Sequence, residues 1–286
     1  MHTITIGTHK ILIPGCWNEL TAEQLIQMAK LINGNIGLEE IKVKMLFIFT
    51  GIKVVQQPSV LVDGKEFFWI RHQKRKFLVS AHSLAHISSP FLNFFTEINE
   101  NEWIIKPTIT RQLLPIVEVG KVKLHGPADG LSNITFREFI FAETALNQLI
   151  AANDTTQLNQ LIGILYRPFG KIKQGTLAYT GDVREKFNDN NMDEQAKLIA
   201  SMPKELKRAI LWYYKGCKQH LSTLFPLVFS EGSATSKSTF EVFMTIVDDI
   251  ANNQPAEHER ILDVLLYSAL QSLNNRIEKS LRHVEV

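Results

Sequence analysis

The chain has 286 residues, of which 45% are hydrophobic and 21% charged, and its formal net charge is +2. This composition excludes an intrinsically disordered chain, which would have fewer apolar residues and a larger net charge. The small net charge also excludes a strong overall attraction to nucleic acid or to an anionic membrane, so any such binding needs a local patch.

Cysteine usage and the absence of long apolar runs predict the compartment. Only Cys16 and Cys217 are present, and such a pair, far apart in the sequence, is typical of free thiols in a reducing environment. The strongest apolar run, residues 45–49, is far shorter than the roughly 20 residues that a membrane helix needs. Residues 1–6 lack the basic start and continuous apolar stretch of a signal peptide. We therefore expect a cytoplasmic protein without a membrane partner.

The first part of the chain predicts mixed α/β structure. Residues 9–14 predict a short strand, and a helix is expected to begin after Thr21. Thr21 and Gln24 can form a capping box, in which each side chain accepts a hydrogen bond from the other residue's backbone N–H. Residues 41–54 fit a helix by the spacing of their apolar side chains and a strand by their β-branched content, so both interpretations stay open.

A β-hairpin is expected next. Residues 60–62 and 66–70 read as two strands, because the Asp63-Gly64 pair between them readily adopts the positive φ angles of a tight turn. Residues 76–79 predict a third strand. This segment therefore indicates a small antiparallel sheet.

Between this sheet and the helical part, the pattern changes twice. Residues 80–98 are typical of a helix in part, interrupted near Pro90, because proline is unfavourable in a helix interior. Residues 109–124 alternate between apolar and polar side chains and predict a returning pair of strands.

After the turn-forming residues 125–130 the chain becomes almost wholly helical. Thr135 and Glu138 repeat the capping-box pattern of Thr21 and Gln24. Residues 177–190 predict an exposed polar connection between helices. The expected helices cover residues 135–152, 157–166, 193–201, 203–224, 238–251 and 255–282.

These elements predict an α+β protein that is predominantly α. A small N-terminal mixed α/β part with a β-hairpin is followed by a helical bundle, with a boundary near Gly130. We expect a mixed α/β domain over residues 1–130 and a helical domain over residues 131–286.

No pattern of reactive residues predicts catalysis, and we expect a protein that is not an enzyme and needs no cofactor or metal. His82 and His86 are four residues apart, a spacing that can place two zinc ligands on one side of a helix. A third ligand is not evident in the sequence, so packing histidines are the favoured interpretation.

A basic run provides one alternative function. Arg71, Lys74, Arg75 and Lys76 follow Phe67, Phe68 and Trp69, and cations with aromatic neighbours can contact a phosphate backbone. The favoured interpretation is a solvated turn of the hairpin. Nucleic acid or an acidic partner remains the functional alternative.

The last predicted helix carries an apolar stripe at alternating spacings of three and four residues, as a helix seam requires. Burial against the chain's own helices is the favoured interpretation, and a partner helix or self-association is the alternative. The stripe consists of Leu262, Leu266, Ala269, Leu273 and Ile277.

Five short segments together resemble proteins of tailed bacteriophages and related prophages that are generally regarded as tail assembly chaperones or other tail-module components. The Arg167-Pro168 dipeptide is the most typical of that family; its arginine can contact carbonyls or carboxylates at a helix end, or the pair can simply stop the helix. The segments are residues 17–21, 125–131, 134–139, 160–168 and 202–214.

The resemblance implies a role without catalytic residues. It indicates a protein that binds phage tail or other virion proteins during assembly, in the host-cell cytoplasm, with the virion as a further location. The apolar helix faces are then expected to pack against protein, either this chain or another.

Overall fold

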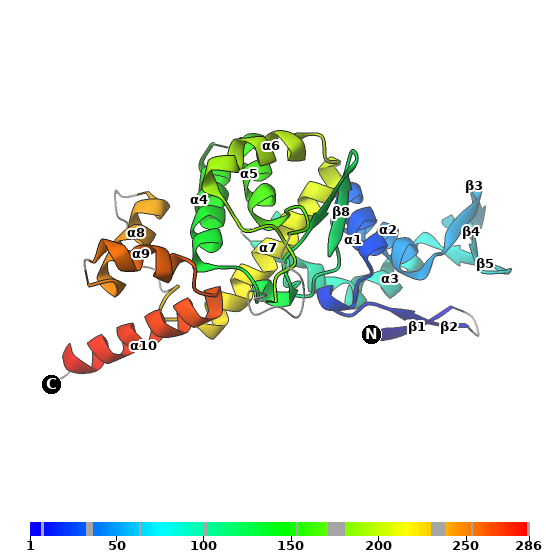
Figure 1. Ribbon diagram of the computed structural model, residues 1–286. Coiled ribbons are helices and arrows are strands. Elements are labelled where there is room, and N and C mark those ends of the chain that lie inside the picture. Colours follow the sequence, from blue (N-terminus) through cyan, green and yellow to red (C-terminus); the bar gives the residue numbers. More distant parts are fainter. Residues whose placement is uncertain are drawn as a thin grey trace. The chain divides into compact units, whose positions relative to one another are not determined.

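The computed structural model describes residues 1–6, 9–32, 37–62, 64–99, 102–152, 154–170, 181–229, 238–252 and 254–284. The fold is α+β and predominantly helical, with small antiparallel sheets, which confirms the predicted class (Figure 1). The chain divides into two compact units. The first comprises Met1–Ile109 and Lys204–Trp212, and the second comprises Thr110–Pro203 and Tyr213–Val286.

Within the described residues, the strands form sheets with strands that are adjacent in the sequence. There the two-stranded sheets are β1–β2, β6–β7 and β8–β9, and a three-stranded sheet has the order β3–β4–β5. The strands are β1 (His2–Ile6), β2 (His9–Ile13), β3 (Lys53–Val62), β4 (Lys65–His72), β5 (Arg75–Ser80), β6 (Thr96–Asn99), β7 (Glu102–Ile105), β8 (Ile116–Val119) and β9 (Val122–His125).

Helices make up most of the second unit. The α-helices are α1 (Ala22–Leu31), α2 (Leu38–Thr50), α3 (Ala81–Phe91), α4 (Phe136–Ala152), α5 (Thr155–Leu165), α6 (Met192–Ala200), α7 (Lys204–Leu224), α8 (Thr239–Ile250), α9 (Pro255–Leu262) and α10 (Leu266–Val284).

Helix starts follow the predicted caps. The Thr21 hydroxyl accepts a 3.2 Å hydrogen bond from the Gln24 N–H, and the Gln24 side chain accepts one of 2.9 Å from the Thr21 N–H. The same reciprocal pair joins Thr135 and Glu138, at 2.9 and 3.2 Å. These bonds satisfy backbone donors that the first helical turn otherwise leaves unpaired.

The ambiguous segment over residues 41–54 contains both predicted structures. Helix α2 ends at Thr50, and Gly51 follows it with φ of +69°. Glycine adopts this left-handed conformation without steric cost, so the chain can leave the helix and begin β3 two residues later, at Lys53.

Two details of the first unit differ from the sequence predictions. Helix α3 extends through Pro90 to Phe91, so the proline lies in the last turn rather than interrupting the helix earlier. The short hairpin β6–β7 occupies residues for which the pattern predicted either a helix or no structure.

An aromatic cluster forms part of the core of the first unit. Trp17 is buried and lies edge-on to Trp212, with ring centroids 5.5 Å apart. It also lies edge-on to Phe94 at 6.4 Å. Such edge-to-face pairs add to the hydrophobic stabilisation that burial of the rings supplies. Arg208 donates a 2.7 Å hydrogen bond to the Ala29 carbonyl and so joins α7 to the end of α1.

In the second unit, α4 packs against α5 and α8, and α5 packs against α6 (Figure 1). Glu143 of α4 is buried, accepts a 2.8 Å hydrogen bond from the Tyr214 hydroxyl and pairs with Lys218. These two bonds compensate for the loss of water around the carboxylate and connect α4 to α7.

The single helix predicted over residues 255–282 is wrong, because the chain breaks it into α9 and α10. The residues at the break pair with the start of α4: the Phe136 N–H donates to the Val264 carbonyl at 2.8 Å, and the Leu266 N–H donates to the Ile134 carbonyl at 2.9 Å. Asp263 pairs with Arg137 at 3.4 Å. Hydrogen bonds to a distant segment thus replace those of a continuous helix.

The compact units part between Ile109 and Thr110, not at residue 130, and the first unit includes the first nine residues of α7. Residues 110–130 lie in the second unit, where the Tyr166 hydroxyl donates to the Leu114 carbonyl at 2.9 Å and strand β9 bonds to Arg167. The division into two domains at residue 130 stays a prediction.

Among the residues that the structure describes, none of the helices combines the length and the apolar character needed to cross a bilayer.

The two thiols should react very differently. Cys16 is exposed, whereas Cys217 is buried in α7, and burial raises the pKa of the Cys217 thiol to about 12. At pH 8 we expect iodoacetamide to label one cysteine in the folded protein and two in urea, because only the thiolate reacts and Cys217 is protonated and covered. Mass spectrometry of peptides measures this. Labelling of Cys217 in the folded protein would contradict the packing of α7, and Cys16→Ser is the control that should abolish native labelling.

Candidate functional site

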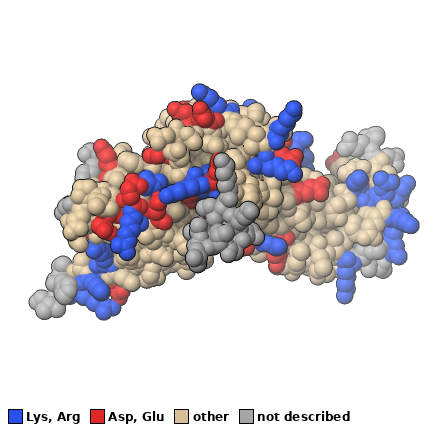
Figure 2. Space-filling view, in the orientation of Figure 1, with Lys and Arg blue, Asp and Glu red and all other residues tan. Residues whose placement is uncertain are grey.

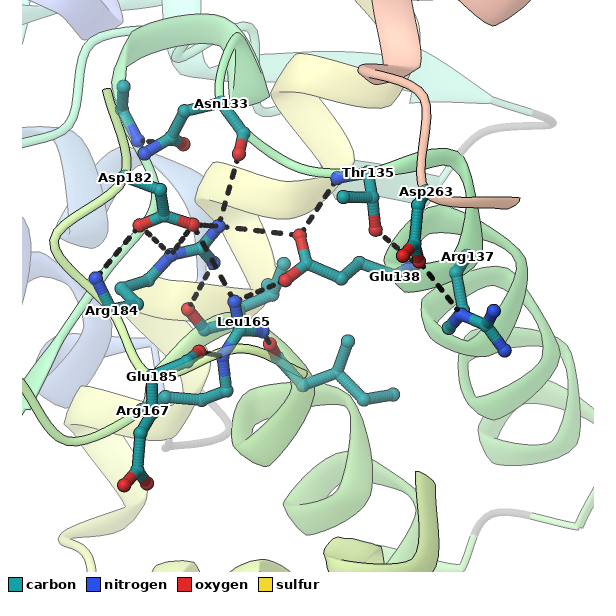
Figure 3. A network of polar contacts seen from close by, with 12 residues as sticks. Asn133, Thr135, Arg137, Glu138, Leu165, Arg167, Asp182, Arg184, Glu185 and Asp263 are labelled. Carbon is teal, nitrogen blue, oxygen red and sulfur yellow. Dashed lines mark hydrogen bonds and ion pairs between the residues drawn. The ribbon is translucent and has the colours of Figure 1, made fainter. Parts of the chain in front are cut away.

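An ion network of Glu138, Arg167, Asp182 and Arg184 lies largely inside the second unit (Figure 3). The Glu138 carboxylate pairs with Arg167 through one oxygen and with Arg184, at 3.3 Å, through the other. Arg184 also pairs with Asp182 at 2.7 Å. Two positive and two negative groups therefore balance one another in the second unit, which makes the burial of Glu138, Arg167 and Arg184 beside the half-buried Asp182 tolerable.

Three separate segments supply these side chains. Glu138 is the capping-box residue of α4, and Arg167 lies two residues after α5 ends. Asp182 and Arg184 come from an irregular segment, which an isolated bridge between Arg184 and Phe169 holds beside the end of α5. The network thus joins the start of one helix to the end of the next and to the chain that follows.

Backbone carbonyls accept most of the remaining arginine N–H groups. Arg167 donates to the carbonyl of Glu185 at 2.7 Å and also to that of Ile164. Arg184 donates to the carbonyls of Leu165, at 2.9 Å, and Asn133, at 3.4 Å. The planar guanidinium has five donors in a fixed geometry, and lysine could not reproduce this set of bonds.

Burial affects the two arginines differently. Loss of hydration lowers the pKa of Arg167 despite the attraction of Glu138. For Arg184, loss of hydration acts in the same direction, but Glu138 and Asp182 outweigh it and the pKa is raised. Arg184 therefore has the stronger electrostatic support, since it contacts two carboxylates closely.

The cavity beside this network is too small to bind a substrate. The cavity that Arg167, Gly163 and Phe187 line has a volume of ≈ 20 Å³, which is about the space for one water molecule. Arg167 also lies over the Phe187 ring, 5.8 Å from its centroid. Chemically, the arrangement holds chain segments in place by charge and hydrogen bonding.

A larger apolar groove lies in the first unit, between α2, α3 and one face of the β3–β4–β5 sheet. Its volume is ≈ 430 Å³, within the range of ordinary binding pockets, and its lining is mainly apolar. Several of its apolar side chains are only half-buried. The lining residues are Glu39, Glu40, Val43, Lys44, Phe47, Val54, Phe68, Ala81, Leu84 and Ala85.

The predicted basic run lies at the turn between β4 and β5. Arg71 pairs across the strands with Lys76, and His72 pairs with Arg75. Lys74 lies in the turn itself, and all four basic side chains of the run are exposed. Direct cross-strand partners point to the same face, so Arg71 and Lys76 share one face of the sheet and Arg75 belongs to the other.

The predicted apolar stripe is divided by the break between the last two helices. Leu262 ends α9, whereas Leu266, Ala269, Leu273 and Ile277 lie on α10. The first four are buried and Ile277 is half-buried. Four of the five side chains are therefore covered by this chain in the conformation described, and a partner would first have to displace what covers them.

The histidine pair gains no further ligand. The rings of His82 and His86 stack with centroids 6.5 Å apart on α3. Over the described ranges of the chain, no group of three or more His, Cys, Asp or Glu side chains lies close enough to hold a metal ion.

Sequence reasoning identified Glu138, Arg167 and Pro168 but missed Asp182 and Arg184. The expectation that residues 177–190 form an exposed connection is wrong for Arg184, of which only 4% is exposed; residues 177–180 lie outside the described residues. The unusual feature that could have been noticed is the pair of charges in Asp182-Val-Arg184, where the Asp182 carboxylate accepts from the Arg184 N–H at 2.9 Å. The apolar groove gave no local signal, because distant segments line it.

Removing one charge from the network should destabilise the second unit. Glu138→Gln keeps an oxygen that can accept from the Thr135 N–H, but it leaves two buried arginines with one carboxylate. We expect the free energy of unfolding to fall by about 3 kcal/mol or more, as when a buried ion pair loses a partner. Urea denaturation followed by circular dichroism measures this change.

The matched control is Glu278→Gln, which removes the same charge from an exposed pair with Arg282 on α10. Exposed helical pairs contribute little, so a change within about 0.5 kcal/mol is expected. Equal effects of the two substitutions would contradict a stabilising role for the buried network.

No protein-family model matches this chain, and no curated protein or solved structure was found to match it. The resemblance to phage tail-module proteins therefore stays a prediction from the sequence.

Proposed function

We propose that this protein is a non-enzymatic virion assembly factor or structural component of a tailed phage or prophage that acts through protein–protein contacts, with tail assembly chaperone as one such role. The single observation that carries a binding role is the apolar groove beside α2 and α3, because partly exposed apolar side chains around a concave surface are typical of protein-binding sites. The phage assignment depends on the resemblance of the five sequence segments.

Those segments coincide with packing features of the fold. Trp17 at the start of the first unit is buried, as are Phe136 and Phe139 on α4 and Tyr214 on α7. Arg167, in the most family-like dipeptide, belongs to the buried ion network. The resembling residues named here are buried, so the resemblance supports a similar fold and does not identify a partner. The partner is therefore inferred from the exposed surfaces of the chain.

The expected occupant of the groove is the apolar face of a helix from a tail protein. Val43, Phe47 and Phe68 are half-buried in the groove and can accept anchoring side chains at helical spacing. Glu39, Glu40 and Lys44 lie at its rim, and Glu40 pairs with Lys44 at 2.7 Å, so a helix with side chains of both charges beside its apolar anchors would complement the site.

Co-expression with the tail proteins encoded beside it, followed by affinity purification, tests this function. A charge or a bulky group in the groove should release a bound helix, because a desolvated charge in an apolar site is costly. We expect Val54→Asp and Ala85→Arg each to lower partner recovery about tenfold or more, equivalent to about 1.4 kcal/mol of binding free energy.

Ile150→Asp is the matched control, because Ile150 is 65% exposed on α4 and is not among the residues that line the groove. Thermal unfolding by circular dichroism checks that each variant is folded. Repeated failure of the unaltered protein to retain any tail protein would refute the assembly role. Recovery that both groove variants leave unchanged would refute the groove as the binding site. Mass spectrometry of purified particles then separates a chaperone, which is absent, from a component that remains in the virion.

A further inference from the structure

The outer face of the β3–β4–β5 sheet, opposite the apolar groove, carries three cations in a row. Lys53 pairs across the strands with Arg71, and Arg71 pairs with Lys76. Direct cross-strand partners point to the same side and lie about 5 Å apart, so the three side chains form one line across the sheet. All three are exposed. Figure 2 shows blue side chains gathered over these strands.

This row is electrostatically unfavourable for the isolated chain. Like charges directly opposite each other on neighbouring strands destabilise a sheet. Within the described residues, no carboxylate lies within ion-pair distance of Lys53, Arg71 or Lys76. A bound polyanion would remove the repulsion and gain three ionic contacts.

The surface beside the row is hollowed. A depression of ≈ 480 Å³ is lined by Lys53 and Arg71 together with Thr50, Gly51 and neighbouring residues of the turn. Two cations at the wall of one hollow are suited to an anionic group of the size of phosphate.

An apolar platform continues from the cations along the same strands. Trp69 pairs with Leu78, and each lies two residues from a cation, Arg71 or Lys76, so they share the outer face about 7 Å away. Trp69 is 36% exposed and Leu78 43% exposed. The exposed indole beside a cation row provides both parts of a single-stranded nucleic-acid site, a stacking surface for bases and positive charge for the backbone.

An acidic protein segment would use the cations but would leave the exposed indole without a flat partner. A base pair in a duplex keeps its faces stacked inside the helix, so duplex nucleic acid could not use the indole either. Unpaired bases joined by phosphates match both the charge and the aromatic surface.

The geometry points to the outer face of this sheet, formed by Lys53, Arg71, Lys76, Trp69 and Leu78, as a binding surface for single-stranded nucleic acid. This surface lies on the face opposite the groove of the proposed assembly function and does not depend on that function. It also differs from the basic run over residues 71–76. Lys53, which is outside that run, belongs to the surface, whereas Arg75 lies on the other face of the sheet.

Fluorescence anisotropy with labelled oligothymidylate of 20 nucleotides tests the surface on the full-length chain. Binding should weaken with added salt, and log K should fall with log salt by about 0.7 for each phosphate contact, or about 2 for three. Lys53→Ala should lower the slope by about 0.7, and Arg71→Ala with Lys76→Ala by about 1.4. Trp69→Leu should weaken binding about tenfold at fixed salt through lost stacking.

Arg75→Ala is the matched control, since it removes a cation from the same run but from the other face. It should leave the slope nearly unchanged, and circular dichroism verifies that every variant is folded. Absence of binding at 50 mM salt, or an effect of Arg75→Ala equal to that of Arg71→Ala, would overturn the proposal. Equal affinity for polyglutamate or for vesicles with anionic lipid, undiminished by Trp69→Leu, would also overturn it, because the surface would then recognise charge alone.

Discussion

The helical unit depends on a buried carboxylate that serves two purposes. Glu138 accepts the Thr135 N–H at the start of α4 and compensates the charges of Arg167 and Arg184. Burying an ion without partners costs several kcal/mol, so the arginines can be inside because this carboxylate and that of Asp182 compensate their charges. They in turn bind carbonyls at the end of α5. A local helix cap has thus become the centre of a tertiary network.

Backbone hydrogen bonds impose a second constraint on the start of α4. The backbone on either side of Thr135 pairs with the break between α9 and α10 through two hydrogen bonds. The start of α4 is therefore fixed by side-chain charges on one side and by backbone bonds on another. This arrangement explains why the apolar stripe of the last helices is divided, and why most of it is buried in the chain itself.

The first unit uses one small sheet for two different surfaces. Period-two alternation sends Phe68 toward the apolar groove and Trp69 to the opposite face. One face is suited to an apolar helix and the other to a polyanion. The proposed protein contact and the proposed nucleic-acid contact would thus use opposite sides of the same three strands.

The sequence by itself determined the features that depend on residues close in the chain. Capping boxes at Thr21 and Thr135, the β3–β4 hairpin and the helical character after residue 130 all follow from spacings of a few residues. Only the tertiary structure decided that Arg184 meets Glu138, 46 residues away, and that Lys53 joins Arg71. Local spacing sets the conformational preference of a segment, but which charges are buried together depends on which segments the hydrophobic core brings into contact.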